Sequence, residues 1–174
     1  REGIALGTSD EWGDHVSEIT TAVIDSSFVN YTSLTSTARW FNRLSNLKTI
    51  TGLYRVKTDN VRDMEAMFAE CSSLTDLDVT PFVTKNVKNM RYMFYNCSGM
   101  RRLDLTNFNT SKLTDMYRMF KGCFAMRVIF AGPDWTTEKV TSGEEVFNEC
   151  TNIVGGETTR SRSEERRVGK ECRS

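Results

Sequence analysis

Hydrophobic residues recur along the chain in four columns, with a step of 26 residues and one step of 27 at the end. The columns hold Phe68, Phe94, Phe120, Phe147; Cys71, Cys97, Cys123, Cys150; Met67, Met93, Met119, Val146; and Leu74, Met100, Met126, Ile153. A fixed step of this length is typical of solenoids, in which each coil contacts only its neighbours. The pattern predicts a scaffold that presents an extended surface rather than an enclosed catalytic pocket.

The first part of each repeat has the pattern of a half-buried strand. Apolar and polar residues alternate through 77–79 and 103–105, which is the two-residue period of a strand. Residues 129–131 stand at the equivalent positions of the next repeat and are all apolar. We expect Leu77, Leu103, Leu105 and Ala131 to point inward, and the segments that begin at Leu77 and Leu103 to pair as parallel strands. Parallel crossovers are almost always right-handed, so a right-handed solenoid is expected.

The second part of each repeat has a different period. Val87, Met90, Met93 and Phe94 stand at i, i+3, i+6 and i+7, which predicts one apolar stripe on a short helix. Gly122 in the next repeat suits the left-handed position that ends a helix. The predicted fold is therefore an α/β solenoid with one short parallel strand and one short helix in each 26-residue coil.

The polar positions of the predicted strands form the candidate binding face. If the apolar positions point inward, their neighbours point outward and line one side of the stack, a side that repeat proteins often use for binding. Phe130 has two interpretations. It is either an exposed aromatic anchor of an interface, or a residue covered by a C-terminal cap that this sequence lacks. The candidate partner-binding residues are Asp76, Asp78, Thr80, Arg102, Asp104, Thr106, Val128 and Phe130.

The pattern also sets the domain limits. Residues 1–18 show no repeat and are expected to form an N-terminal cap, residues 19–159 hold about five coils, and residues 160–174 are expected to be a disordered tail. The run from Arg162 to Ser174 resembles the in-frame translation of a sequencing adapter, so an assembly artefact is the hypothesis for this tail; a natural basic tail is the alternative. The chain does not begin with Met, and an internal fragment of a longer protein is expected.

Composition limits the partners. The 174 residues carry a net charge of zero and are 39% hydrophobic, so the whole chain gives no reason to expect nucleic acid as a partner. No stretch is apolar for long enough to span a bilayer. The sequence does not indicate an oligomeric state.

The cysteines and the single histidine are the possible chemical groups. The cysteine column has Leu44 at its first position, and a buried Cys often behaves as a small hydrophobe, so buried free thiols are favoured over the disulfides Cys71–Cys97 and Cys123–Cys150. Paired zinc ligands at C-x₂₋₄-C spacing are absent from the sequence. His15 is expected at a solvated edge. We expect no catalytic residue, no metal site and no cofactor, and therefore no enzyme.

The run from Asn86 to Cys123, NVKNMRYMFYNCSGMRRLDLTNFNTSKLTDMYRMFKGC, closely resembles the 26-residue repeat of BspA-like bacterial leucine-rich-repeat surface proteins. The resemblance continues in weaker form from about Trp12 to Thr159. It departs from the family pattern at Gly143 and Val146 in the last coil, and at Trp40, in a coil that has no Cys.

This resemblance implies a secreted or cell-surface protein that adheres to other cells or to host extracellular proteins. The alternatives are a general protein-interaction scaffold, or a non-catalytic repeat region of a larger enzyme. The ligand and the mode of anchoring do not follow from the residues.

Overall fold

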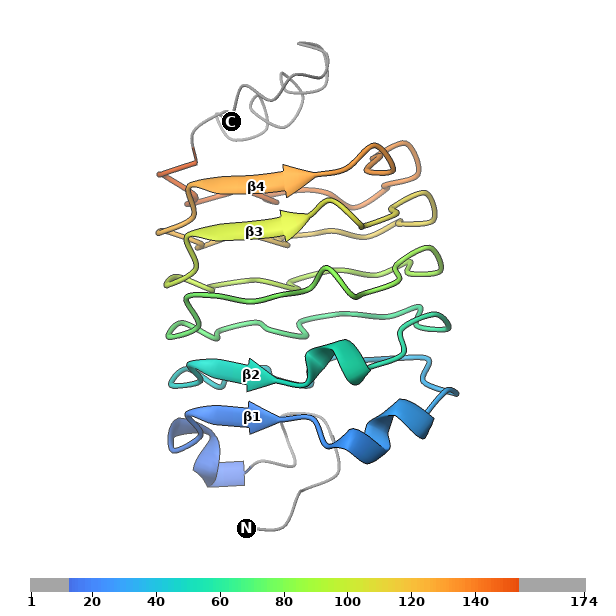
Figure 1. Ribbon diagram of the computed structural model, residues 1–174. Coiled ribbons are helices and arrows are strands. Elements are labelled where there is room, and N and C mark those ends of the chain that lie inside the picture. The colour runs from blue at the N-terminus through green and yellow to red at the C-terminus, as the bar shows by residue number, and fades with distance from the viewer. Residues whose placement is uncertain (1–12, 154–174) are drawn as a thin grey trace.

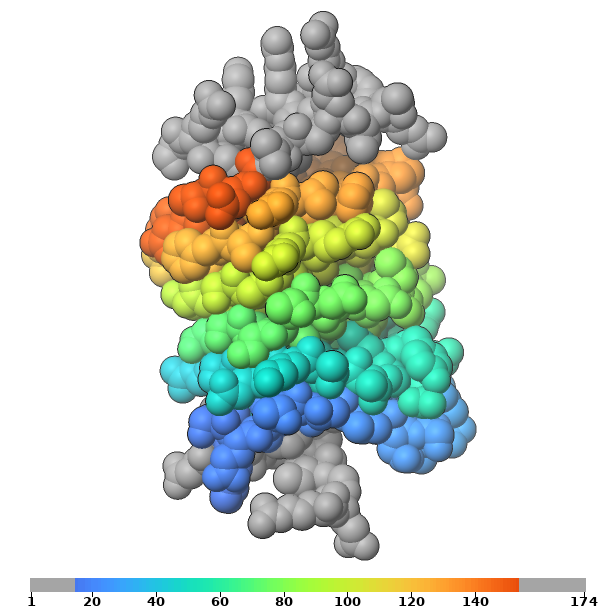
Figure 2. Space-filling model, turned by 60° about the vertical axis from the view of Figure 1, so that its left-hand side comes forward, coloured from blue at the N-terminus to red at the C-terminus, as the bar shows by residue number. Residues whose placement is uncertain are grey.

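The computed structural model describes residues 13–153, which wind into coils stacked in chain order (Figures 1 and 2). The chain enters through the 3-10 helix η2 (Gly13–Ser17), which includes part of the predicted cap; residues 1–12 and the predicted tail lie outside the described residues. The other elements are β1 (Thr21–Val23), η3 (Ser26–Asn30), β2 (Thr49–Thr51), η4 (Leu53–Arg55), β3 (Arg102–Leu105) and β4 (Val128–Ala131).

The strands lie along one side of the stack, in two separate pairs. β1 pairs with β2 in parallel, with Ala22 beside Ile50, and β3 pairs with β4 in parallel, with Leu103 beside Ile129. Leu77 and Val79 are buried as expected, but their segment is not a strand and pairs with neither β2 nor β3 (Figure 1).

The predicted pairing of the segments at Leu77 and Leu103 is therefore wrong. Asp76 and Asp78 in the middle segment are exposed, so water can satisfy the backbone polar groups here without a ladder. Where the strand ladder is interrupted, the coils are held together by the apolar core and by the opposite side of the stack.

The other side of the stack carries an unbroken backbone ladder. Parallel bridges join the five residues Ser36, Asp63, Asn89, Asp115 and Ser142 in turn. Beyond each bridge, alternate N–H groups donate to the next coil, as from Ala66 to Arg91 O (2.8 Å) and from Phe68 to Met93 O (3.0 Å). We call segments 36–44, 63–71, 89–97, 115–123 and 142–150 the rung segments, and their outward side the turn face.

The rung segments are not helices, and the described residues contain no α-helix, so the predicted helix in each coil is wrong. The amides that do not bond to the next coil close tight turns within the segment, as from Met93 to Met90 O and from Cys97 to Phe94 O. Two residues in each rung segment have positive φ, for example Tyr92 at 57° and Asn96 at 54°. Left-handed residues at this spacing cannot continue a right-handed helix.

The apolar stripe is nevertheless buried, because successive tight turns bring every third or fourth side chain to the same side. Phe41, Phe68, Phe94, Phe120 and Phe147 stack as near-parallel rings, with centroids 5.2–5.7 Å apart and interplanar angles of 4–6°. Met67, Met93 and Met119 have no exposed surface. Burying one such side chain stabilises the fold by roughly 1.5–3 kcal/mol, so the column joins the coils through the middle of the stack.

A buried column of threonines adds a polar connection. The Thr84 hydroxyl donates to Asn109 O (3.0 Å) and accepts from Asn109 N (2.8 Å). Thr58 and Thr110 make the same reciprocal pair with Val83 and Thr136. Each hydroxyl is fully satisfied by the neighbouring coil, which removes the cost of burying it.

Candidate functional site

The candidate binding residues on the middle coils lie on the outward side of the strands, which we call the strand face. In β3 the exposed Arg102 and Asp104 alternate with the buried Leu103 and Leu105. Thr106, which follows the strand, is also exposed. In the neighbouring coil Asp76 and Asp78 are exposed and Thr80 is half-buried.

Two of these aspartates also shape the backbone. The Asp104 carboxylate accepts hydrogen bonds from the Thr106 hydroxyl (2.7 Å) and the Thr106 N–H (3.0 Å), and these bonds hold the pKa of Asp104 below its ordinary value. Asp78 accepts the same pair from Thr80. The D-x-T spacing is the sequence signal for such a turn, and the alternation of apolar and polar residues does not reveal it.

The last strand differs from the prediction. Val128 and Phe130 are half-buried, and the guanidinium of Arg102 lies 5.7 Å from the Phe130 ring centroid, so the neighbouring coil partly covers this ring. Ala131, which was expected to point inward, is exposed, and Ile129 is half-buried. β4 belongs to the last coil of the described residues, whereas β3 has a described coil on each side (Figure 1), and the inward positions of β4 are therefore less covered than those of β3.

An open groove is formed by the segments that follow the strand positions in three neighbouring coils. It has a volume of about 520 Å³ and includes Thr80 and Thr106 of the strand face. Its other lining residues are Pro81, Phe82, Val83, Thr84, Lys85, Asn107, Asn109, Pro133 and Asp134. Hydroxyl, amide and charged groups thus continue from the strand face into a shallow depression.

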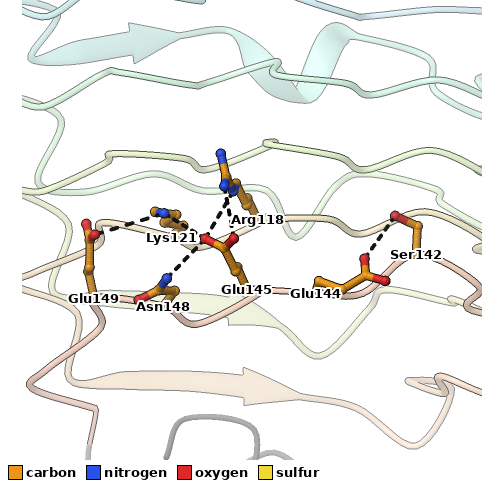
Figure 3. A network of polar contacts seen from close by, with 7 residues as sticks. All are labelled: Arg118, Lys121, Ser142, Glu144, Glu145, Asn148 and Glu149. Atoms are coloured by element: carbon orange, nitrogen blue, oxygen red, sulfur yellow. Dashed lines mark hydrogen bonds and ion pairs between the residues drawn. The ribbon is translucent and has the colours of Figure 1, made fainter. Parts of the chain in front are cut away.

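The turn face carries ion pairs between neighbouring coils. Glu145 accepts a bidentate pair from Arg118 (2.9 and 3.1 Å) and a further bond from Lys121 (2.7 Å) (Figure 3). These donors, Arg118 first, lower the pKa of Glu145 to about 2. Arg39 pairs with Glu65 (3.3 Å) and Arg43 with Glu70 (3.9 Å), each through a single nitrogen–oxygen contact between neighbouring coils. In the sequence these pairs are visible as residues of opposite charge one repeat apart, a signal that the search for apolar columns does not find.

The cysteine column consists of buried free thiols in the structure. Each thiol donates to the carbonyl of a phenylalanine in the preceding coil: Cys97 to Phe68 O (3.1 Å) and Cys123 to Phe94 O (3.1 Å). Leu44 stands in the first rung segment, where no earlier phenylalanine of the column offers such a carbonyl. Burial raises the pKa of Cys97 to about 12, so this thiol stays protonated at neutral pH and is a poor nucleophile.

Residues 35–157 match the family described as "Mycoplasma protein of unknown function, DUF285". The chain belongs to the DUF285 family. The match includes every bridge residue from Ser36 to Ser142 and also β2, β3 and β4. β1 lies before it.

No curated protein matches the chain. Among solved structures, it is similar to a leucine-rich cell surface protein from Faecalibacterium prausnitzii A2-165, with a TM-score of 0.40, 20% identity, and coverage of 78% of this chain and 42% of that one. It is also similar to the T. pallidum leucine-rich-repeat protein TpLRR (TM-score 0.44, 14% identity, 89% and 71% covered) and to a leucine-rich-repeat protein from Bacteroides ovatus (0.38, 15%, 71% and 33%). This DUF285 chain spans less than half the length of the first of these proteins.

The described residues of this DUF285 chain contain no group of three or more His, Cys, Asp or Glu side chains that could hold a metal ion. His15 is exposed and lies 3.4 Å from Glu18. Between residues 13 and 153, no helix is both long and apolar enough to cross a bilayer.

Proposed function

We propose that the chain is a right-handed leucine-rich-repeat solenoid that binds protein partners through its strand face and acts in adhesion without catalysing a reaction. The observation that carries this proposal is the outward row on β3 and β4, where Arg102 lies beside Val128 and Asp104 beside Phe130. A row of charged, polar and apolar side chains held in register by a rigid core is pre-organised for binding. The resemblance of residues 86–123 to BspA-like repeats supports the same function.

We propose the cell surface or the extracellular space as its location and a host extracellular or cell-surface protein as its partner, both on the basis of that resemblance. We also propose the domain limits given by the sequence: a cap over 1–18, about five coils over 19–159, and an artefactual tail over 160–174. Recovery of the full reading frame tests these points. A secretion signal with an anchor would support surface display and adhesion, whereas an appended catalytic domain would support the alternative of a non-catalytic repeat region in a larger enzyme.

The binding proposal is tested with immobilised extracellular-matrix proteins. Asp104 holds the Thr106 turn, so the variant pair is Asp76→Ala with Arg102→Ala, which removes two exposed strand-face charges and leaves that turn intact. Binding should weaken by about tenfold, as expected for residues near the centre of an interface. Arg62→Ala, at an exposed position outside the strand face, is the control and should bind as the unaltered chain does.

Equal affinity of the double variant and the unaltered chain, with unchanged melting temperatures, would place the binding site elsewhere on the molecule. Failure of every matrix protein to bind the unaltered chain would contradict host adhesion by this region.

A further inference from the structure

The turn face has a regular set of outward positions, and their residue types change along the stack. Each rung segment contributes four such positions: Ala38, Arg39, Asn42, Arg43; Glu65, Ala66, Ala69, Glu70; Arg91, Tyr92, Tyr95, Asn96; Tyr117, Arg118, Lys121, Gly122; and Glu144, Glu145, Asn148, Glu149. The first two sets are joined by ion pairs, and so are the last two. The set 91–96 lies between these charged regions and, with Tyr117, supplies three half-buried tyrosines.

These tyrosines form one cluster. The Tyr92 ring lies 5.4 Å from the Tyr95 ring and 5.5 Å from the Tyr117 ring, in both cases close to edge-on. One coil earlier, Ala66 and Ala69 occupy the positions equivalent to Tyr92 and Tyr95, and both are buried. The preceding coil therefore presents small side chains beside the tyrosines, whereas the following coil has Arg118 and Lys121 at the equivalent positions.

Arg91 lies against two of these rings. Its guanidinium carbon is 5.0 Å from the Tyr92 centroid and 4.9 Å from the Tyr117 centroid. Arg39, Arg43 and Arg118 each pair with a glutamate, but within residues 13–153 Arg91 makes no ion pair. The side chain of Tyr92 accepts a hydrogen bond from Arg91 and raises its pKa, so the charge persists at all accessible pH values.

We propose that Arg91, Tyr92, Tyr95 and Tyr117 form a second docking surface, which binds a protein partner that presents an aspartate or glutamate carboxylate beside apolar side chains. The charge pattern favours this occupant. Arg118 and Lys121 beside the cluster pair with Glu145. Arg91 makes no ion pair within residues 13–153, although Asp115 and Glu65 lie close enough to act on its charge, and its planar donors suit a carboxylate supplied by a partner. Tyrosine and arginine are also the residues most enriched at interface centres, surrounded by a polar rim.

This surface is distinct from the strand face, and the proposal does not rest on adhesion through that face. The two surfaces are formed by different residues of the same coils, 91–95 and 117 on one and 102–106 on the other. The two surfaces therefore share no residue and can be altered separately.

The test uses random peptides displayed as a library and selected on the full chain. Enriched peptides are synthesised in two forms, with each acidic residue kept or replaced by its amide. Three variants alter the cluster: Arg91→Gln, Tyr95→Ala, and Tyr92→Asn, since asparagine tolerates the positive φ of position 92. Arg62→Gln and Tyr54→Ala are the controls, because Arg62 is an exposed arginine outside both surfaces and Tyr54 also lies beneath a guanidinium. A further variant, Arg102→Gln, alters the strand face and distinguishes the two surfaces.

We expect the enriched peptides to contain an acidic residue beside apolar ones. Replacing that acid by its amide, or altering any of the three cluster positions, should weaken binding by at least about tenfold. The two control variants should bind normally, and all variants should melt as the unaltered chain does.

Other outcomes would overturn the proposal. One is a library that yields no binder, or binders that do not need their acid. Another is binding lost in Arg102→Gln and kept in Arg91→Gln, which would place the site on the strand face. Heparin binding that depends on Arg91 without any peptide binding would make the occupant a sulfated glycan. Sedimentation that shows dimers lost in Arg91→Gln would make it a second copy of the chain.

Discussion

The strand side and the turn side of the stack are built from the same repeat and hold the coils together in different ways. On the strand side the backbone ladder is interrupted, because the segment around Leu77 pairs with neither β2 nor β3. On the turn side four consecutive bridges run from Ser36 to Ser142 without a gap. The backbone of the stack is therefore most regular where the sequence predicts helices, and least regular where it predicts strands.

This difference shows that regular stacking does not require regular secondary structure. In each rung segment some backbone N–H groups close local turns and the others donate to the next coil, so every coil can bond to the coil after it. The cost is two left-handed residues in each segment, and the stacked phenylalanines and inter-coil hydrogen bonds offset this cost.

The largest effect is expected from removing a ring from the continuous phenylalanine column. Phe94 has no exposed surface and stacks on Phe68 and Phe120, so Phe94→Ala should lower the free energy of unfolding by about 3–5 kcal/mol. Leu77→Ala, in the segment without a ladder, should cost about 2 kcal/mol, near the lower limit for a buried leucine. Urea titration measures both values.

A leucine pair isolates the contribution of the ladder. Leu103 in β3 and Leu77 in the unpaired segment stand at equivalent positions of successive repeats and are both buried, and alanine removes the same atoms from each. Leu103→Ala should cost more than Leu77→Ala, because β3 is held on the partner strand and closes a cavity less readily. Equal costs would mean that the interruption on the strand side has no energetic consequence.

A smaller change tests the left-handed conformation of Gly122. Gly122 has a φ of 76°, and a Cβ atom there would meet the Asn96 side chain, so Gly122→Ala should lower the urea midpoint and destabilise the protein by about 1–2 kcal/mol. An unchanged or higher urea midpoint would contradict the left-handed conformation at this position. Gly143→Ala, in a rung segment but without positive φ, is the control and should shift stability by less than about 0.5 kcal/mol.

The sequence predicts which side chains are buried better than it predicts the backbone that buries them. Met67, Met93 and Met119 are all fully buried, because a column of like residues at a fixed spacing requires stacking. The spacing i, i+3, i+6, i+7 cannot separate a helix from consecutive tight turns, since both return to the same side every three or four residues. The left-handed residues that decide the matter include Ala66, Tyr92 and Arg118, and these residue types give no local signal.

The binding surfaces are predictable to different degrees for the same reason. Alternation placed Asp76, Asp78, Arg102 and Asp104 outward, and all four are exposed; their role in binding stays a prediction. The cluster around Arg91 was missed, because equivalent positions there hold Ala66, Tyr92 and Arg118, and a search for columns of like residues passes over them. A column whose members change type is visible only once the register is known.

The smallest expected effect concerns the ion pairs between the last two rung segments. The pKa of Glu145 is lowered to about 2 from an ordinary value of 4.5, so its contribution to stability is complete above pH 4.5 and is lost as the pH falls through 2. Glu145→Gln should therefore melt at a slightly lower temperature at pH 7, and the difference from the unaltered chain should shrink as the pH falls from 4.5 towards 2. Glu138→Gln, at an exposed position, should show no such dependence. The effect is small because Arg118 and Glu145 remain partly open to solvent, which screens the pair. A difference that stays constant from pH 7 to pH 2 would mean that Glu145 stabilises the turn face by packing rather than by its charge.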